Sequence, residues 1–312
     1  EIFEMTKVSV VMPVYNTGLY VAEALNSILN QTLRDIEIIV VDDGSTDNSC
    51  EIVAQLASTD SRIKFYKQAS NEGQAVARNI GLRYITGKYV YFMDSDDVLA
   101  ADALECCYRK CEEEDLNAVI FEAEVLTEDK ETRFSFNYHY KDLEDRVYGG
   151  IELMNFLLDT NQFCVSPCML LLRASLLKRW SPVFYSGIIH EDQLFTVMVY
   201  LHATQMGYIK NSFFKRRIRP ASTMTKKISR KNRIGYQTVF EQLSLFALTQ
   251  KDDIKALIDK HRAITLNAFL SIAWPLSFQE KMIFLLFCFR KRYVKQIRFR
   301  NFALFLFKQL KG

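Results

Sequence analysis

The first 120 residues alternate between two hydrophobic periods. Short apolar runs rich in valine, isoleucine and tyrosine are typical of buried strands, whereas apolar residues spaced three and four apart are typical of helices. The runs predict strands over residues 8–12, 37–41, 63–66, 89–93 and 118–121. The helical spacings predict helices over residues 21–29, from about 48, over 73–86 and over 102–115. Strands separated by such helices pair in parallel, which predicts an α/β fold with a Rossmann-like, mostly parallel sheet flanked by helices.

The second half of the chain is less regular. Its pattern predicts a strand over residues 166–173, a helix over 192–202, one or two strands within 205–219, and helices from about 226. We therefore expect a catalytic domain over residues 5–220, with halves of about 5–120 and 121–220, followed by a C-terminal helical region over 221–312. Met5 is a candidate for the natural first residue.

Composition narrows the class of protein. The net charge of +3 is too mild for a general nucleic-acid binder, so no nucleic-acid partner is expected. The seven cysteines are odd in number and lack metal-site spacing, which favours reduced thiols in a cytoplasmic protein. No apolar run reaches the ~18 residues that a membrane-spanning helix needs.

Acidic residues follow two of the predicted strands, and ligands of parallel sheets bind at such strand ends. The run Asp94–Asp97 brings three carboxylates together, which favours a divalent cation, although a solvated turn is the alternative. A calcium-binding EF-hand loop fits worse, because Leu99 stands where that loop requires glycine. Asp42 and Asp43 precede a glycine; a carboxylate there can accept a hydrogen bond from the imide of uracil or thymine, or can simply cap the following helix.

Several segments in register along the first 100 residues resemble the family-2 glycosyltransferases of the GT-A fold. They are Val8–Asn16, Ser27–Thr32, Val41–Asp47, Asn71–Gly73, Ala77–Gly81 and Phe92–Asp97. The resemblance implies that Pro13 and Tyr15 line a nucleotide pocket and that Asp43 holds a uracil-type base, with Asp42 beside it. It implies that Arg78 meets the diphosphate or the sugar. It also implies that Asp96 binds Mn²⁺ or Mg²⁺, with Asp94 as the ribose or sugar contact or a further metal ligand, whereas a role for Asp97 is more doubtful.

The second half offers a general base. Transfer with inversion needs a group that takes the proton of the acceptor hydroxyl. In this family the base is an aspartate at the start of a helix, and the resemblance assigns Asp192 to it, with Glu191 as a contact for an acceptor hydroxyl. The alternative is an ordinary helix start with acids that favour the dipole. Arg217 and Arg219 resemble the family's diphosphate clamp, with Ser222 nearby, and the alternative for them is a solvated basic edge strand.

The tail from Lys281 to Gly312 contains nine Lys or Arg residues, no acid and eight aromatic residues. Such a basic, aromatic and amphipathic segment predicts binding to an anionic membrane surface, and packing against the catalytic domain or a second subunit is the alternative.

These features together predict a metal-dependent, inverting glycosyltransferase of the hexosyl or N-acetylhexosaminyl type. It would move a sugar from a UDP-sugar to a saccharide or lipid-linked acceptor in surface glycan biosynthesis, on the inner face of the cell membrane. One alternative is an inactive protein that binds sugar nucleotides. A sugar nucleotidyltransferase fits less well, because its Gly-rich loop is absent at Pro13–Gly18.

Overall fold

The computed structural model describes residues 6–127, 138–218 and 227–308. Its eight-stranded sheet has the order β3-β2-β1-β4-β7-β6-β8-β5. The strands are β1 (Val8–Val14), β2 (Ile36–Asp42), β3 (Ile63–Lys67), β4 (Tyr89–Phe92), β5 (Val98–Leu99), β6 (Ala118–Thr127), β7 (Leu170–Arg173) and β8 (Met206–Ile218). The α-helices are α1 (Val21–Leu29), α2 (Ser49–Thr59), α3 (Gln74–Gly81), α4 (Ala103–Glu113), α5 (Gly150–Asp159), α6 (Glu191–His202), α7 (Arg230–Ala247), α8 (Asp252–Ile272), α9 (Phe278–Arg290) and α10 (Phe299–Phe307).

The first four strands pair in parallel as the sequence predicts. Every residue of β1 and β2 is buried, because helices cover both faces of this part of the sheet, and such strands are almost continuously apolar. Two of the polar exceptions satisfy each other: Ser9 donates to Glu37 at 2.5 Å, and Lys64 of β3 lies 2.5 Å from the other oxygen of Glu37.

The later strands depart from parallel pairing. β7 runs antiparallel to both β4 and β6, whereas β6 and β8 pair in parallel and extend the sheet beyond β7. The sequence pattern did not predict this insertion of β7, and it did not predict α5. The helix predicted over residues 73–86 ends earlier, at Gly81.

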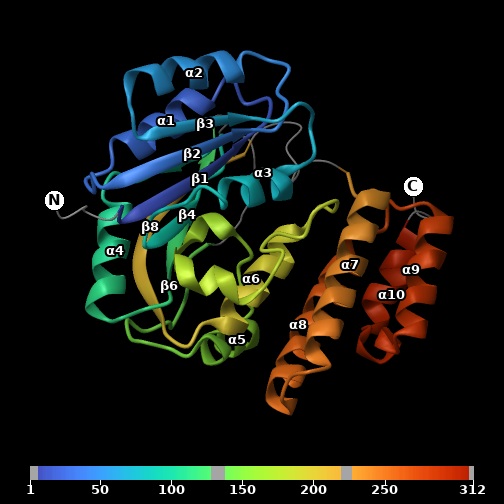
Figure 1. Cartoon of the computed structure of the whole chain (residues 1–312). Helices are drawn as coiled ribbons and strands as arrows, with labels where there is room; N and C mark the ends of the chain where they lie inside the picture. The colour runs from blue at the N-terminus through green and yellow to red at the C-terminus, as the bar shows by residue number, and fades with distance from the viewer. Residues whose placement is uncertain (1–5, 128–137, 219–226, 309–312) are drawn as a thin grey trace.

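Helices cover the two sides of the sheet (Figure 1). α1 and α2 lie on one side and α3 lies on the other, next to α6. α3 comes close to the sheet at Gly81, where an added Cβ would lie 2.5 Å from Cγ1 of Val11. A glycine here brings the helix against β1, and this sets the position of the α3 side chains at the carboxyl ends of the strands.

The C-terminal helices α7 and α8 pack against α6 and α5, and α9 and α10 pack on the other side of α7 and α8 (Figure 1). Their buried residues, Phe240, Phe269 and Phe284 among them, belong to the same hydrophobic core as the sheet. The chain thus ends in packed helices, in line with the predicted fold class, and the domain boundary near residue 220 stays a prediction. Within the described residues, no helix is both long enough and apolar enough to cross a membrane.

Candidate active site

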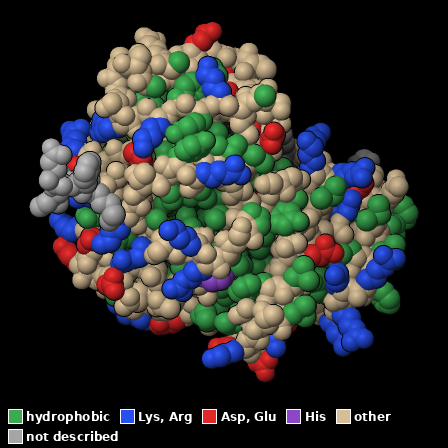
Figure 2. Space-filling model, viewed as in Figure 1, with side chains coloured by type: hydrophobic (Ala, Val, Ile, Leu, Met, Phe, Trp, Pro, Cys, Tyr) green, Lys and Arg blue, Asp and Glu red, His purple; other side chains and the backbone are tan. Residues whose placement is uncertain are grey.

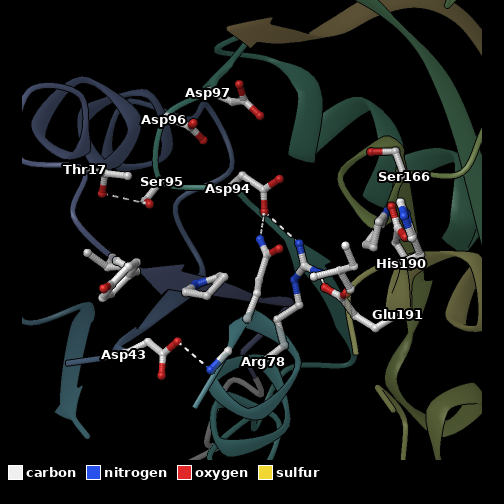
Figure 3. A pocket seen from close by; sticks show the side chains of 18 of the residues that line it. Thr17, Asp43, Arg78, Asp94, Ser95, Asp96, Asp97, Ser166, His190 and Glu191 are labelled. Atoms are coloured by element: carbon white, nitrogen blue, oxygen red, sulfur yellow. Dashed lines mark hydrogen bonds and ion pairs between the residues drawn. The ribbon is translucent and has the colours of Figure 1, made fainter. Parts of the chain in front are cut away.

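A cavity of about 440 Å³ lies beyond the carboxyl ends of β1, β2 and β4 (Figure 3). One wall comes from the loops that follow these strands and from α3, and the other comes from residues 188–192 and β8. Of the residues singled out in the sequence, the cavity lining includes Pro13, Tyr15, Asp43, Arg78, Asp94, Asp96, Asp97, Glu191, Asp192 and Arg217. The fold thus brings together side chains that are as far apart in the chain as Pro13 and Arg217.

The loops after β1, β2 and β4 are tied to one another. Asn16 accepts a hydrogen bond from the backbone N–H of Thr46 at 2.8 Å, and its own N–H donates to Ser45 at 3.0 Å. Thr17 donates to Ser95 at 2.9 Å, which joins the first loop to the acidic run (Figure 3). Thr17 and Ser95 both line the cavity and were not singled out in the sequence. These bonds give the first wall a fixed shape.

Asp43 is held by backbone donors. Its carboxylate accepts from the N–H groups of Glu72 and Gly73 at 2.8 and 2.9 Å, and burial raises its pKa. Gly44 has a φ of +71°, and an added Cβ would lie 2.7 Å from the backbone of Ser70, so the turn requires glycine. Asp42 is placed differently, because it accepts from the N–H of Ser45 at 3.1 Å and is not among the lining residues.

Arg78 connects the two walls. Its guanidinium lies 2.7 Å from Asp94 and 3.4 Å from Glu191, and it stands 5.1 Å from the ring centre of Phe184. Burial lowers the pKa of Arg78, but Asp94 and Glu191 outweigh that effect, so the pKa is raised and the charge persists. Gln74, one turn earlier on α3, donates to the same oxygen of Asp94 at 2.7 Å. The charge of Asp94 is therefore balanced from α3.

The acidic run divides into two parts (Figure 3). Asp94 points toward Arg78, whereas Asp96 and Asp97 lie together farther from it. Asp97 accepts from the N–H of Arg217 at 2.6 Å, and burial, with the nearby charges of Asp96 and Asp94, raises its pKa well above the usual range. Within the described residues, no three His, Cys, Asp or Glu side chains form a ready set of metal ligands. A cation bound to Asp96 or Asp94 would therefore take most of its ligands from elsewhere.

Two arginines of β8 face this acidic run. Arg217 donates from Nε to the carbonyl of Asp96 at 2.9 Å, and its guanidinium lies 2.5 Å from Glu23. Arg216 also lines the cavity, and Asp94 is among the groups that raise its pKa against the opposing effect of burial. The sequence pattern pointed to Arg217 rather than Arg216, because strict alternation sends neighbours to opposite faces. Arg219 and Ser222 lie outside the described residues.

The second wall carries Glu191 and Asp192, the first two residues of α6. Burial raises the pKa of Glu191 to about 7, with the charge of Asp192 adding to the rise and that of Arg78 opposing it. Burial also raises the pKa of Asp192, although His190 and Arg78 oppose this. A buried carboxylate with a raised pKa is a stronger base than a solvated one, so both groups suit proton transfer.

His190 joins this wall to the C-terminal helices. It has a φ of +72°, in the left-handed region that non-glycine residues rarely adopt. Its Nε2 lies 3.1 Å from Nδ2 of Asn232, and its ring lies 4.4 Å from that of Tyr236. Gly235 allows this contact, because an added Cβ would lie 2.2 Å from the carbonyl of Ile189. Helix α7 thus supports the loop that precedes Asp192.

The fold is that of the GT-A class of glycosyltransferases. The chain belongs to glycosyl transferase family 2, whose family model matches residues 9–180. The glycosyltransferase GlyA of Streptococcus pneumoniae is 34% identical over 220 residues, which are 69% of this chain and 31% of that protein. The chain spans 31 to 40% of the length of the first three curated relatives that it matches.

Two solved structures share the fold. Residues 1–349 of TarS from S. aureus, in complex with UDP-GlcNAc, have a TM-score of 0.74 at 23% identity, covering 96% of this chain and 83% of that one. The mannosyltransferase PcManGT of Pyrobaculum calidifontis, with GDP-Man and Mn²⁺, has a TM-score of 0.57 at 16% identity, covering 97% and 84%. The predicted family and fold class are therefore confirmed.

Proposed function

We propose that the protein transfers a hexosyl or N-acetylhexosaminyl group from a UDP-sugar to a hydroxyl, with inversion at the anomeric carbon. The observation that carries this proposal is the position of the partly buried Asp192, across one cavity from the nucleotide-type wall formed by Asp43 and Asp94. Such a cavity would hold the sugar between the base and the diphosphate. The acceptor oxygen could then attack the anomeric carbon from the face opposite the leaving group, as inversion requires.

The first wall is suited to the nucleotide. Asp43 lines the cavity beside Tyr15, whose side chain is 44% exposed and can cover a base. Carboxylate oxygens accept, so Asp43 would take the imide N–H of uracil, which has no counterpart in cytosine. The structure of TarS with UDP-GlcNAc supports a UDP-sugar as the donor, and the roles of Pro13 and Arg78 remain predictions.

The second wall is suited to the transfer step. Asp192 would take the acceptor proton as the acceptor oxygen bonds to the anomeric carbon, and the bonding pair of the departing C–O bond would leave with the diphosphate. The sugar passes through an oxocarbenium-like state. Arg216 and Arg217 would stabilise the charge that gathers on the leaving group. Glu191, held at Arg78, would orient the acceptor hydroxyl.

A divalent cation fits the acidic run. The carboxylates of Asp96 and Asp94 lie near enough to Asp97 to add to the rise that burial causes in its pKa. Mg²⁺ and Mn²⁺ commonly bind through one or two carboxylates and take substrate phosphates as further ligands. Because substrate phosphates would supply further ligands, a cation site needs fewer than three acidic side chains from the described residues. Asp96, with Asp94 as the second candidate, would hold the cation, which would neutralise charge on the diphosphate. The Mn²⁺ in the PcManGT structure supports a divalent cation as a partner of this fold.

The proposed acceptor is a saccharide or a lipid-linked saccharide, and the C-terminal surface supports it. Phe284 and Phe305 are buried, but Phe289 and Phe299 are 73% and 84% exposed among Lys and Arg side chains. Hydrophobic and basic side chains lie side by side over these helices (Figure 2). Such a surface favours anionic lipid headgroups, so we propose peripheral binding to the inner face of the membrane in the cytoplasm.

Calorimetric titration tests the donor. UDP, GDP and CMP are titrated into the wild type with manganese and with a chelator, and into Asp96→Ala with Asp102→Ala as a matched exposed control. We expect UDP alone to bind, with at least a tenfold loss of affinity without metal or without Asp96. If no nucleotide binds, the transferase proposal loses its support. If UDP binds and UDP-sugars give no product with any acceptor, the inactive binding protein is favoured.

Vesicle sedimentation tests the membrane proposal. The double variant Phe289→Ser/Phe299→Ser should bind vesicles of anionic lipid at least tenfold more weakly than the wild type. Leu19→Ser, which changes an 88% exposed side chain far from this surface in the sequence, is the control. Equal binding of all three proteins would contradict the proposal.

A further inference from the structure

A second cavity, of about 230 Å³, lies between the acceptor half and the C-terminal helices. It is lined by Leu157, Leu158, Asn161, Phe163, Val165, Gln193, Tyr236, His261, Ile264, Thr265 and Ala268. Asn161 and Ala268 are exposed, so the cavity opens to the surface beside them. An apolar cavity of roughly 150 Å³ is enough to admit benzene, so this one can hold a ring-sized group.

Two polar atoms of the lining residues have no hydrogen-bond partner within the described residues, although both are buried. They are Oε1 of Gln193 and Nδ1 of His261. The His261 side chain is 1% exposed, and its other ring nitrogen lies 3.3 Å from Oγ1 of Thr265. Buried polar atoms are nearly always paired, so these two suit a ligand that can form hydrogen bonds with them.

The chemistry of these atoms limits the ligand. An amide oxygen only accepts hydrogen bonds, so the ligand must donate to Gln193. Burial lowers the pKa of His261 to about 4, so its ring is neutral near pH 7 and Nδ1 donates or accepts according to its tautomer. A single hydroxyl satisfies both atoms when Nδ1 carries the ring proton, because its one hydrogen goes to Oε1 of Gln193 and its oxygen accepts from Nδ1–H of His261. A charged ligand is disfavoured, because the lining carries no Asp, Glu, Lys or Arg to pair with it.

We propose that this cavity is a second ligand site, which binds a small neutral alcohol: a ring or branched alkyl group that carries a hydroxyl. The apolar side chains Leu157, Phe163 and Ile264 hold the hydrocarbon part, and Gln193 and His261 hold the hydroxyl. Its place beside the proposed base gives it a functional context. Asp192 lines the first cavity and Gln193 lines the second, and the neighbours Ser166 and Val165 divide in the same way.

Binding is tested on the full chain with ¹³C-labelled isoleucine methyl groups. Ile264 lines the second cavity, whereas Ile188 and Ile189 line the first, so their signals separate the two sites. The probes are benzyl alcohol and ethylbenzene, which have nearly the same shape and differ in the hydroxyl. We expect both to shift Ile264, with benzyl alcohol binding about five- to tenfold more tightly. His261→Leu should remove most of this preference.

Ala268→Phe should fill the mouth and weaken benzyl alcohol binding at least tenfold, whereas Ala256→Phe, at another exposed alanine of α8, should not. Equal affinity for the two probes would show a purely apolar void. No shift at Ile264 would show a cavity that holds water only, and binding that survives Ala268→Phe would place the probe elsewhere. Each result overturns the proposal. UDP added to the same samples reports on the first cavity through Ile188 and Ile189, so failure of the proposed function is seen separately.

Discussion

The two walls of the main cavity are held in different ways. On the first wall, backbone N–H groups bind the functional side chains, as at Asp43, and the loops bind one another, as at Thr17 and Ser95. On the second wall, Glu191 and Asp192 have few donors, and packing against α7 supports their loop through His190. Backbone N–H groups fix the position of Asp43, which the binding of a nucleotide requires. Glu191 and Asp192 accept few hydrogen bonds, and they therefore keep the raised pKa that proton transfer requires.

Removing the base of the second wall should have the largest effect. Asp192→Asn keeps the shape and removes proton acceptance, so turnover of a UDP-sugar should fall by about 10²- to 10⁴-fold. UDP affinity, which depends on the first wall, should stay unchanged by calorimetry. Asp253→Asn, at the start of α8, is the control. Normal turnover in Asp192→Asn would assign the base elsewhere.

Removing the residue that joins the walls should destabilise the whole protein. Arg78→Met leaves the buried Glu191 and the partly buried Asp94 without their cation, which should cost about 3–5 kcal/mol of unfolding free energy in urea titrations. The triple variant with Asp94→Asn and Glu191→Gln removes those charges and should recover much of the loss. If the triple variant is no more stable than Arg78→Met, packing rather than charge is the cause.

The second wall should also show in the pH dependence of stability. Glu191 has a folded pKa of about 7 against 4.5 for the free side chain, so the folded state holds its proton more tightly. Its contribution is complete below pH ~4.5 and is lost as pH rises to about 7, and the difference is roughly 3 kcal/mol. The difference in unfolding free energy between the wild type and Glu191→Gln should therefore change across this window. A constant difference from pH 4.5 to 7 would contradict the raised pKa.

The support from α7 is tested by a smaller change. Replacing a glycine inside a helix with alanine normally stabilises it by about 1 kcal/mol. Gly235→Ala should do the reverse, because its Cβ would meet the carbonyl of Ile189, and overpacking costs about 1–3 kcal/mol. Turnover should fall as well, while UDP affinity stays the same. The control is Gly149→Ala, whose Cβ would lie 3.9 Å from its nearest neighbour. If Gly235→Ala were more stable than the wild type, the idea that α7 supports the loop before Asp192 would be wrong.

The sequence predicted the first half of the fold well, because β1 to β4 and their helices carry clear hydrophobic periods, and β2 and β4 lead into acidic residues. Asp43, Asp94 and Asp192, which were singled out from their places at the ends of strands and the start of a helix, line one cavity in the structure. The sequence did not predict β7 between β4 and β6, because pairing partners distant in sequence leave no local period. It also did not single out Arg216, since the cavity receives neighbouring residues of β8, nor the contact of His190 with Tyr236, which depends on tertiary packing.

The contact between His190 and Tyr236 has a consequence for protein engineering. Exchanging acceptor preference between relatives by grafting C-terminal helices would place a foreign α7 against the native 188–192 loop. The left-handed backbone of His190 would then lose the ring and the amide that hold it. A chimaera should therefore carry this loop and α7 as one unit, although about 40 positions separate them in the chain.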